Sequence, residues 1–178
     1  MPPENRDVQV RAGDEDDLEA LTELYNHYIR ETSITFDMEP FTPEQRRPWL
    51  LSHPKDGPHR LLVARSAGAS GDEAGPLLGY ATSSAFRPKA AYAPSVEVTA
   101  YCAPHAAGRG IGTLLYRALF EALSTEDVHR AYAGITQPNE ASHRLHTRFG
   151  FRPIGTYTEV GRKFGRYWDV AWYQKDLG

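Results

Sequence analysis

The feature that most constrains this chain is a glycine-rich turn that opens a helix. Residues 103–119 carry Gly108, Gly110 and Gly112 within five positions and continue with apolar residues at spacings of three and four. That spacing predicts an amphipathic helix. Glycine destabilises a helix but lets a ligand approach the backbone, where the first N–H groups of a helix have no internal partner. The turn is therefore either a phosphate-binding cradle or a tight strand-to-helix connection.

The turn does not match two common phosphate-binding motifs. No Gly-Lys-Ser or Gly-Lys-Thr follows it, so it is not a P-loop. Thr113 stands where the last glycine of a dinucleotide-binding fingerprint belongs. The pattern alone leaves both interpretations open.

The bulk properties narrow the class of protein. A chain of 178 residues is long enough for one domain, and we expect a single domain over 1–178. The net charge of −3 gives no general attraction to nucleic acid or anionic membrane, despite the basic residues near 162–166. The single cysteine, Cys102, excludes an internal disulfide and fits a reducing compartment. With no membrane-length apolar run and a polar N-terminus, we expect a cytoplasmic protein.

The order of the elements predicts the fold class. Asp14 and Thr42 each have the character of a helix N-cap, and Gly150 fits the end of a later helix. The segment 66–75, rich in Gly, Ser and Ala, reads as a solvated hairpin loop. The predicted order is β-α-α-β-β-β-α-β-α-β-β, with strands at 8–13, 59–68, 75–86, 95–103 and 128–137 and a final pair within 151–177. This order indicates an α/β protein with a mixed sheet covered by helices on both faces.

Three segments together resemble a known superfamily. They are a strand carrying Glu97, the turn Ala-Gly-Arg-Gly-Ile-Gly at 107–112, and the run 139–151 that contains Asn139 and ends in Gly-Phe. In this order they resemble the GNAT superfamily of acyl-CoA-dependent N-acetyltransferases. Ala107 departs from the usual Gln or Arg of the first motif. The resemblance implies a mostly antiparallel central sheet with helices on both faces, and acetyl-CoA as co-substrate.

The resemblance extends to one branch of the superfamily. The blocks 26–40, 86–92, 96–116 and 161–177 look like the phosphinothricin and methionine sulfoximine/sulfone acetyltransferases. This branch implies direct transfer of an acetyl group to the α-amino group of a small amino-acid substrate. It also implies a homodimer, which the aromatic C-terminal block would suit.

Two residues are candidates for the chemistry. An ammonium group cannot attack a thioester, so a base that takes its proton speeds the reaction. In the resembled branch the glutamate at the position of Glu97 is the proposed base, and a histidine stands at the position of His146. The competing interpretations are a solvated strand glutamate and a helix histidine packed on the sheet. Cys102 is better read as a small buried hydrophobe than as a nucleophile.

The branch also implies residues that hold the two substrates. Arg87 and Lys89 would hold acidic groups with Tyr92, although their cations appear in swapped order, and Phe36 would cover the substrate side chain. Without Tyr92 and the resemblance, a surface charge pair is the favoured interpretation of Arg87 and Lys89, and Phe36 could equally be a core phenylalanine. The cofactor contacts would come from the strand, the turn and the later helix: Tyr101, Cys102, Gly108, Arg109, Gly110, Ile111, Gly112, Thr113, Asn139 and Ser142.

Other functions remain as alternatives. The chain could be a GNAT enzyme for another amine, or a non-catalytic module that binds acyl-CoA. Turnover with a panel of amines separates these possibilities. The pair His143 and His146 has no acidic ligand pattern near it, so we expect no zinc and no other metal.

Overall fold

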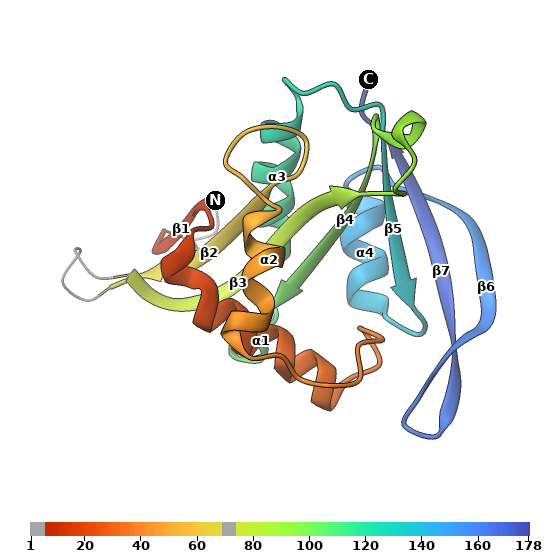
Figure 1. The fold of residues 1–178 in the computed structure, drawn as a ribbon, viewed down its shortest axis with the longest axis horizontal. Helices are drawn as coiled ribbons and strands as arrows, with labels where there is room; N and C mark the ends of the chain where they lie inside the picture. The colour runs from red at the N-terminus through yellow and green to blue at the C-terminus, as the bar shows by residue number, and fades with distance from the viewer. Residues whose placement is uncertain (1–5, 69–73) are drawn as a thin grey trace.

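One twisted sheet organises the chain, of which the computed structural model describes residues 6–68 and 74–178 (Figure 1). In these residues seven strands pair in the order β1-β2-β3-β4-β5-β7-β6. Every neighbouring pair is antiparallel except β4 with β5. The strands are β1 Val8–Ala12, β2 Leu61–Ala67, β3 Ala74–Ala85, β4 Ser95–Cys102, β5 Arg130–Thr136, β6 Arg152–Lys163 and β7 Arg166–Asp176. The expected mixed, mostly antiparallel sheet is confirmed.

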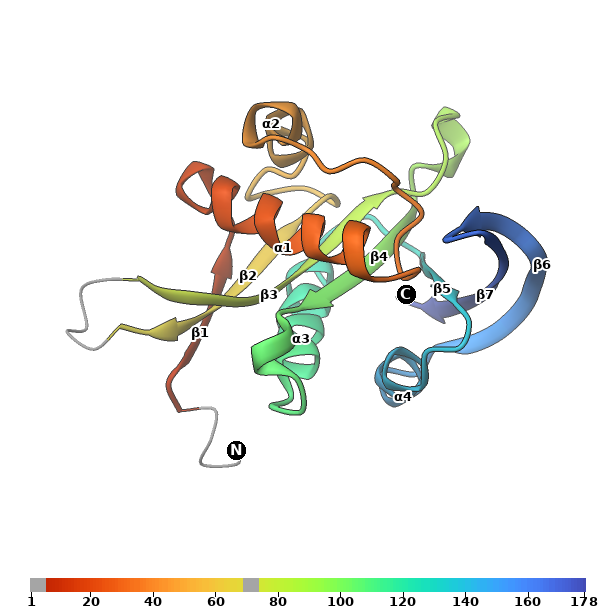
Figure 2. The ribbon, with the colours of Figure 1, turned by 90° about the horizontal axis from the view of Figure 1, so that it is seen from below.

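Helices cover both faces of this sheet, as expected. Figure 2 shows helices on both sides of the sheet. The helices on the first side are α1 Leu18–Glu31 and α2 Pro43–Leu51, and those on the second are α3 Ile111–Leu123 and α4 Glu140–Arg148. The order of strands and helices along the chain agrees with the order that the sequence predicts.

Local sequence signals fix several element ends. Thr42 accepts a hydrogen bond from the N–H of Gln45, whose side chain accepts one from the N–H of Thr42, so the capping box forms as expected. Asn139 caps α4 through the N–H of Ser142. Asp14 caps a short 3-10 turn rather than α1 itself, and α1 begins directly after that turn.

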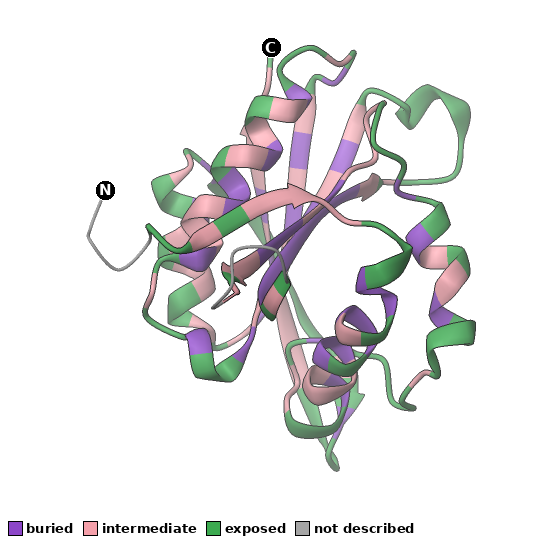
Figure 3. Ribbon diagram, turned by 90° about the vertical axis from the view of Figure 1, so that its left-hand side faces the viewer, coloured by how far each residue is buried: buried purple, intermediate pink, exposed green. Residues whose placement is uncertain are grey.

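The core lies between the sheet and the helices, and the most deeply buried stretches in Figure 3 are central strands and inner helix faces. The apolar stripe of α3 supplies Ile111, Leu115 and Leu119, all at most 2% exposed. The predicted hairpin loop at 66–75 joins β2 to β3, with Ala67 paired to Ala74, and its central residues 69–73 lie outside the described residues.

The parallel strands β4 and β5 separate soon after they meet. Only three residue pairs join them, the last being Glu97 with Tyr132. Beyond that pair the two strands diverge, which Figure 1 shows as a V between β4 and β5. A sheet that opens in this way leaves backbone groups of β4 without a neighbouring strand, and such groups need other partners. The divergence places the candidate site.

Candidate active site

A cleft of about 400 Å³ runs through the sheet where β4 and β5 diverge. Its walls come from four segments: Val98–Ala103 of β4 and its end, the turn into α3, Ala133–Thr136 of β5, and α4. Successive residues of a strand face opposite sides of the sheet. Tyr101 packs on Tyr28 of α1, whereas Cys102 lies beside Gly112 of α3. The cleft therefore reaches both faces of the sheet.

The N-terminus of α3 forms one end of the cleft. Gly110 is the residue before the helix, with φ of +73°, a conformation that glycine adopts without strain. A Cβ on Gly112 would lie only 3.1 Å from Leu145 Cδ2, so glycine lets α3 pack closely on α4. The N–H groups of Ile111, Gly112 and Thr113 begin the helix and have no carbonyl partner within it. This arrangement fits the phosphates of a CoA group, because phosphate binds well at a helix N-terminus.

Two arginines that the sequence analysis missed also line this end. Arg144 and Arg148 of α4 border the cleft, and Arg148 Nη1 donates to Thr113 Oγ1 at 2.8 Å. Guanidinium groups are strong partners for phosphate oxygens. Their spacing of four residues places them on one face of a helix. That spacing was the available signal, but it reads equally well as an exposed basic helix face.

The structure brings together nearly all of the predicted cofactor residues. Nine of them line the cleft: Tyr101, Cys102, Gly108, Gly110, Ile111, Gly112, Thr113, Asn139 and Ser142. Arg109 is the exception, because it belongs to the turn but is not among the lining residues. Cys102 is half-buried, and burial raises the pKa of its thiol, opposed by the N–H of Gly112. A thiol with a raised pKa is a poor nucleophile, which favours the small-hydrophobe interpretation.

His146 borders the cleft but has both ring nitrogens engaged. The residue is 4% exposed. Nδ1 lies 2.7 Å from the carbonyl oxygen of Ser142, which can only accept, so Nδ1 carries the proton. Nε2 then accepts from the hydroxyl of Tyr116 at 2.8 Å. Burial lowers the pKa of His146, the Ser142 carbonyl opposes this, and His143 adds to it. The surroundings therefore hold a neutral, oriented imidazole.

Glu97 lies where β4 and β5 begin to separate. It is half-buried and, four residues from Tyr101, faces the α1 side of the sheet. Burial raises the pKa of its carboxyl, while the positive charge of Arg87 lowers it. A carboxylate with a raised pKa is a better proton acceptor. Glu97 lines neither this cleft nor the smaller cavity that its strand partner Tyr132 lines.

A second cavity, of about 270 Å³, lies beside Glu97. Tyr132, the strand partner of Glu97, lines it together with Phe86, Arg87 and Trp172. The rings of Phe86 and Tyr132 stack with centroids 4.5 Å apart, and Arg87 Cζ lies 4.2 Å from the Phe86 centroid. Gly155 and its neighbours on β6 complete the wall. Apolar walls with one cation at the edge suit a small ligand with an acidic group.

The other predicted substrate residues lie further out. Lys89 and Tyr92 are exposed at the short helical turn after β3, and neither lines the cavity that Arg87 borders. Tyr92 reaches Phe86 edge-on, with centroids 6.0 Å apart. Phe36 is 37% exposed and packs on Gly161 of β6, while its neighbour Ile34 lines the cofactor cleft. The acceptor roles of Lys89, Tyr92 and Phe36 stay predictions.

The described residues were also compared with the requirements of a metal site and of a membrane-spanning helix. Over 6–68 and 74–178, no group of three or more His, Cys, Asp or Glu side chains is placed to hold a metal ion. Within the same residues, no helix combines the length and the apolar character needed to cross a bilayer.

Comparison with known proteins identifies the family. The sequence model of the acetyltransferase (GNAT) family matches residues 21–151, most of the chain. The chain belongs to the GNAT family. It is an N-acetyltransferase, and the alternative of a non-catalytic binding module is not supported.

The relatives of this GNAT enzyme come from the expected branch. It is 69% identical over 175 residues to the phosphinothricin N-acetyltransferase of Streptomyces coelicolor, covering 98% of this chain and 99% of that protein. It is 32% identical over 161 residues to the L-methionine sulfoximine/L-methionine sulfone acetyltransferase of Pseudomonas aeruginosa, covering 90% of each.

A solved structure of a family member has the same fold. A GNAT phosphinothricin acetyltransferase from Sinorhizobium meliloti, in complex with acetyl-CoA, matches with a TM-score of 0.87 at 28% identity. The match covers 97% of this chain and 89% of that one. The GNAT fold and the branch inferred from the sequence are therefore confirmed.

Proposed function

We propose that this GNAT enzyme acetylates the α-amino group of a small amino acid with an acidic, sulfone or sulfoximine side chain, such as phosphinothricin. Acetyl-CoA is the donor, and the acetyl group passes directly to the amine while both substrates are bound. The strong similarity to a phosphinothricin N-acetyltransferase supports the substrate class. We place the reaction in the cytoplasm, because a chain with a single cysteine suits a reducing compartment.

The observation that carries this proposal is the geometry at the divergence of β4 and β5. The N-terminus of α3 and α4 lie on one face of the sheet, and the carboxyl of Glu97 faces the other. The cleft opens between them directly beyond the Glu97–Tyr132 pair. A thioester supplied from the α3 side can thus meet an amine held on the Glu97 side.

The chain's own residues then have distinct roles. The α3 N-terminus, with Arg144 and Arg148, binds phosphates. Glu97 takes a proton from the ammonium group of the acceptor, directly or through water, which frees the lone pair that attacks the thioester carbonyl. The C–S bond then breaks, and CoA leaves as the thiol with the second proton that the nitrogen gives up. Arg87 at the edge of the second cavity binds the acidic group, helped from further out by Lys89 and Tyr92. His146, whose ring is fixed by Tyr116 and Ser142, assists Glu97 by orienting the amine.

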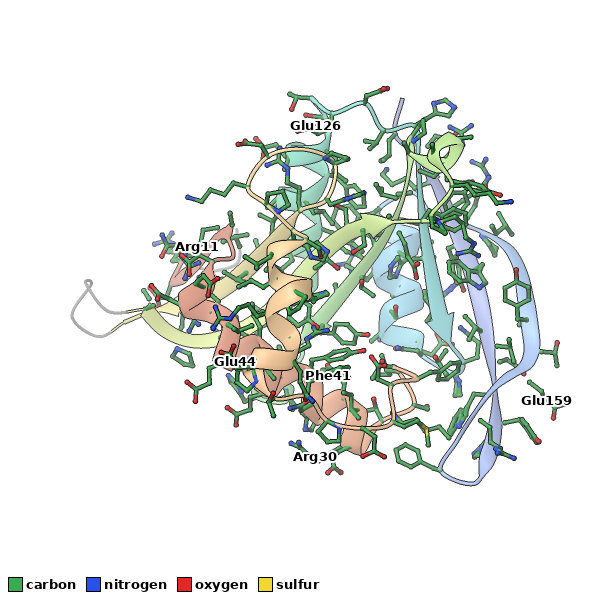
Figure 4. The ribbon with its side chains drawn as sticks, in the orientation of Figure 1. Arg11, Arg30, Phe41, Glu44, Glu126 and Glu159 are labelled. Atoms are coloured by element: carbon green, nitrogen blue, oxygen red, sulfur yellow. The ribbon has the colours of Figure 1, made fainter. Side chains whose placement is uncertain are left out.

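We also propose that the enzyme is a homodimer. The β6–β7 hairpin exposes Ile154, Tyr157, Val160, Phe164 and Tyr167, each 50–56% exposed. Side chains stand out from this hairpin in Figure 4, where Glu159 marks its outer edge. An exposed apolar surface of this kind favours protein contact. Light scattering should give a molar mass of twice the chain mass for the wild type. In Tyr157→Glu the molar mass should fall to that of a single chain. A monomeric wild type would refute the proposal.

A direct assay tests the reaction. Free thiol release from acetyl-CoA is measured with phosphinothricin, methionine sulfone, methionine sulfoximine, glutamate and spermidine as acceptors. We expect turnover with the first three and none with spermidine, which the cation Arg87 would repel. The acetylated product should carry the acetyl group on the α-nitrogen. Turnover with spermidine alone would refute the acceptor site while leaving the cofactor cleft intact.

A further inference from the structure

Lys163 is buried although it belongs to a strongly basic stretch of sequence. It is the last residue of β6 and only 3% exposed, and lysine is seldom buried unless it is paired. Its Nζ donates to the main-chain carbonyl of Thr35 at 2.8 Å. Within the described residues no carboxylate oxygen lies within ion-pair distance of this ammonium. Its other partners are weaker: the charge of Asp37, and the Phe164 ring, whose centroid lies 5.2 Å from Nζ. Burying an ammonium with these partners is costly.

The segment that Lys163 contacts borders the active site. Residues 34–37 follow α1, and in Figure 1 the loop after α1 lies near the end of the β6–β7 hairpin. Ile34, with Tyr28 of α1, lines the cleft on the α1 side of the sheet, the side that Glu97 faces. On the inner side, Thr35 Oγ1 lies 2.8 Å from the hydroxyl of Tyr25, which also donates to Asp37. The segment is therefore held between α1 and the hairpin.

Gly161 gives the hairpin a second contact with the same segment. The Phe36 ring lies directly on its backbone, because a Cβ on Gly161 would be 2.2 Å from Phe36 Cε2. Gly161 and Lys163 are two residues apart on one strand and so face the same side. One side chain of the segment thus rests on Gly161 while its main chain is bound by Lys163.

We propose that Lys163 is a positioning residue: through the Thr35 carbonyl its ammonium fixes residues 34–37 as the acceptor-side wall of the active site. The inference rests on the proposed function, because it takes Phe36 as part of the acceptor site. Lys163 itself does not contact the reacting atoms. It sets where Phe36 lies relative to the acceptor, so it determines acceptor affinity rather than cofactor binding.

The test compares two lysines that make the same kind of bond. Lys163→Met removes the bond to Thr35, and Lys175→Met, the control, removes a bond from Lys175 Nζ to the Phe149 carbonyl at 2.7 Å. We expect Lys163→Met to raise KM for phosphinothricin about tenfold, which matches the loss of one hydrogen bond from a charged donor. KM for acetyl-CoA should stay within twofold. Lys175→Met should change neither KM.

A second readout does not depend on activity. Amide hydrogen exchange of residues 34–37, followed by mass spectrometry, should be faster in Lys163→Met than in wild type and unchanged in Lys175→Met. Lys163→Arg keeps a cationic donor and should restore most of the protection and of the acceptor KM. If the wild type acetylates none of the acceptors, the proposed function fails, while the exchange rates still decide whether Lys163 positions the segment.

Two results would overturn the proposal. The first is unchanged exchange and unchanged acceptor KM in Lys163→Met. The second is an equal rise of both KM values, which marks a general loss of structure. Should Lys163→Met fail to fold, Gly161→Ala displaces Phe36 from the other contact and must give the same selective rise in acceptor KM; equal effects on both substrates there would again refute the role.

Discussion

Replacing Glu97 with glutamine tests the centre of the proposed reaction. Glu97→Gln keeps the shape of the side chain and removes its ability to accept a proton at neutral pH. Loss of a general base lowers the rate by about a hundred- to ten-thousand-fold, equivalent to about 3–5 kcal/mol of barrier. The matched control is Glu121→Gln, an exposed glutamate on α3 that should leave kcat unchanged.

The pH dependence of kcat/KM is a second test of Glu97 as the base. Burial raises the pKa of Glu97 and the charge of Arg87 lowers it, and as a base Glu97 must be ionised. The wild-type kcat/KM should therefore fall as pH drops through a pKa above the ordinary glutamate value of about 4.3. Arg87→Gln removes the opposing charge, so this acidic limb should move to higher pH, whatever happens to acceptor affinity. In Glu97→Gln the limb should disappear.

Stability separates lost chemistry from lost structure. A carboxyl whose pKa is raised on folding stabilises the fold below its unfolded pKa, and that contribution is lost as pH rises through the folded pKa. At neutral pH the ionised Glu97 thus opposes folding. Glu97→Gln should have a Tm equal to or above that of wild type. Retention of kcat within about threefold, or an acidic limb that Arg87→Gln leaves in place, would refute the assignment of Glu97 as the base.

Three further changes probe the surroundings. Tyr116→Phe removes the donor to Nε2 of His146, so the pKa of His146 measured by NMR should rise and the free energy of unfolding should fall by about 1 kcal/mol; an unchanged titration would contradict the hydrogen bond. Asp17, in the short turn before α1, is buried and pairs with Arg11 and Arg65. Asp17→Asn removes this carboxylate from both arginines and should lower the free energy of unfolding, measured in urea, by about 3–5 kcal/mol. Although burial alone raises the pKa of Asp17, its hydrogen bonds hold it below the ordinary value, so in wild type this stability should be lost as pH falls through that lowered pKa. Arg148→Met should raise KM for acetyl-CoA about tenfold and leave the acceptor KM unchanged; equal effects on both would place Arg148 outside the phosphate end of the cleft.

Local signals predicted the elements of this fold well. The capping box at Thr42, the cap at Asn139 and the glycine turn before α3 each depend on a few neighbouring residues. The order of elements followed from such signals and from periodicity. The position of β7 between β5 and β6 did not, because strand order depends on pairings between residues far apart in the sequence.

The parts of the candidate site that come from adjacent residues in the sequence were predictable. The contacts between residues from distant elements were not. The turn at 108–113 and α4 meet at the cleft as expected, apart from Arg109. By contrast, the hydrogen-bond partner of His146 Nε2 is Tyr116 from another helix, and no local sequence pattern predicts that bond. Lys163 shows the strongest limit: among basic neighbours it reads as a solvated cation, yet the fold buries it against Thr35.

The two sides of the active site differ in how far they depend on the C-terminal hairpin. The cofactor cleft draws mainly on residues 98–148, inside the region 21–151 that matches the GNAT family. The second cavity and the Lys163 contact depend on β6 and β7, which lie beyond that region. Within residues 6–68 and 74–178 the hairpin pairs with the rest of the sheet only through β7 and β5, so its outer strand can change without disturbing the α3 turn. The wall that β6 gives to the acceptor side can therefore diverge between members of the family while the means of holding the acetyl donor stays the same.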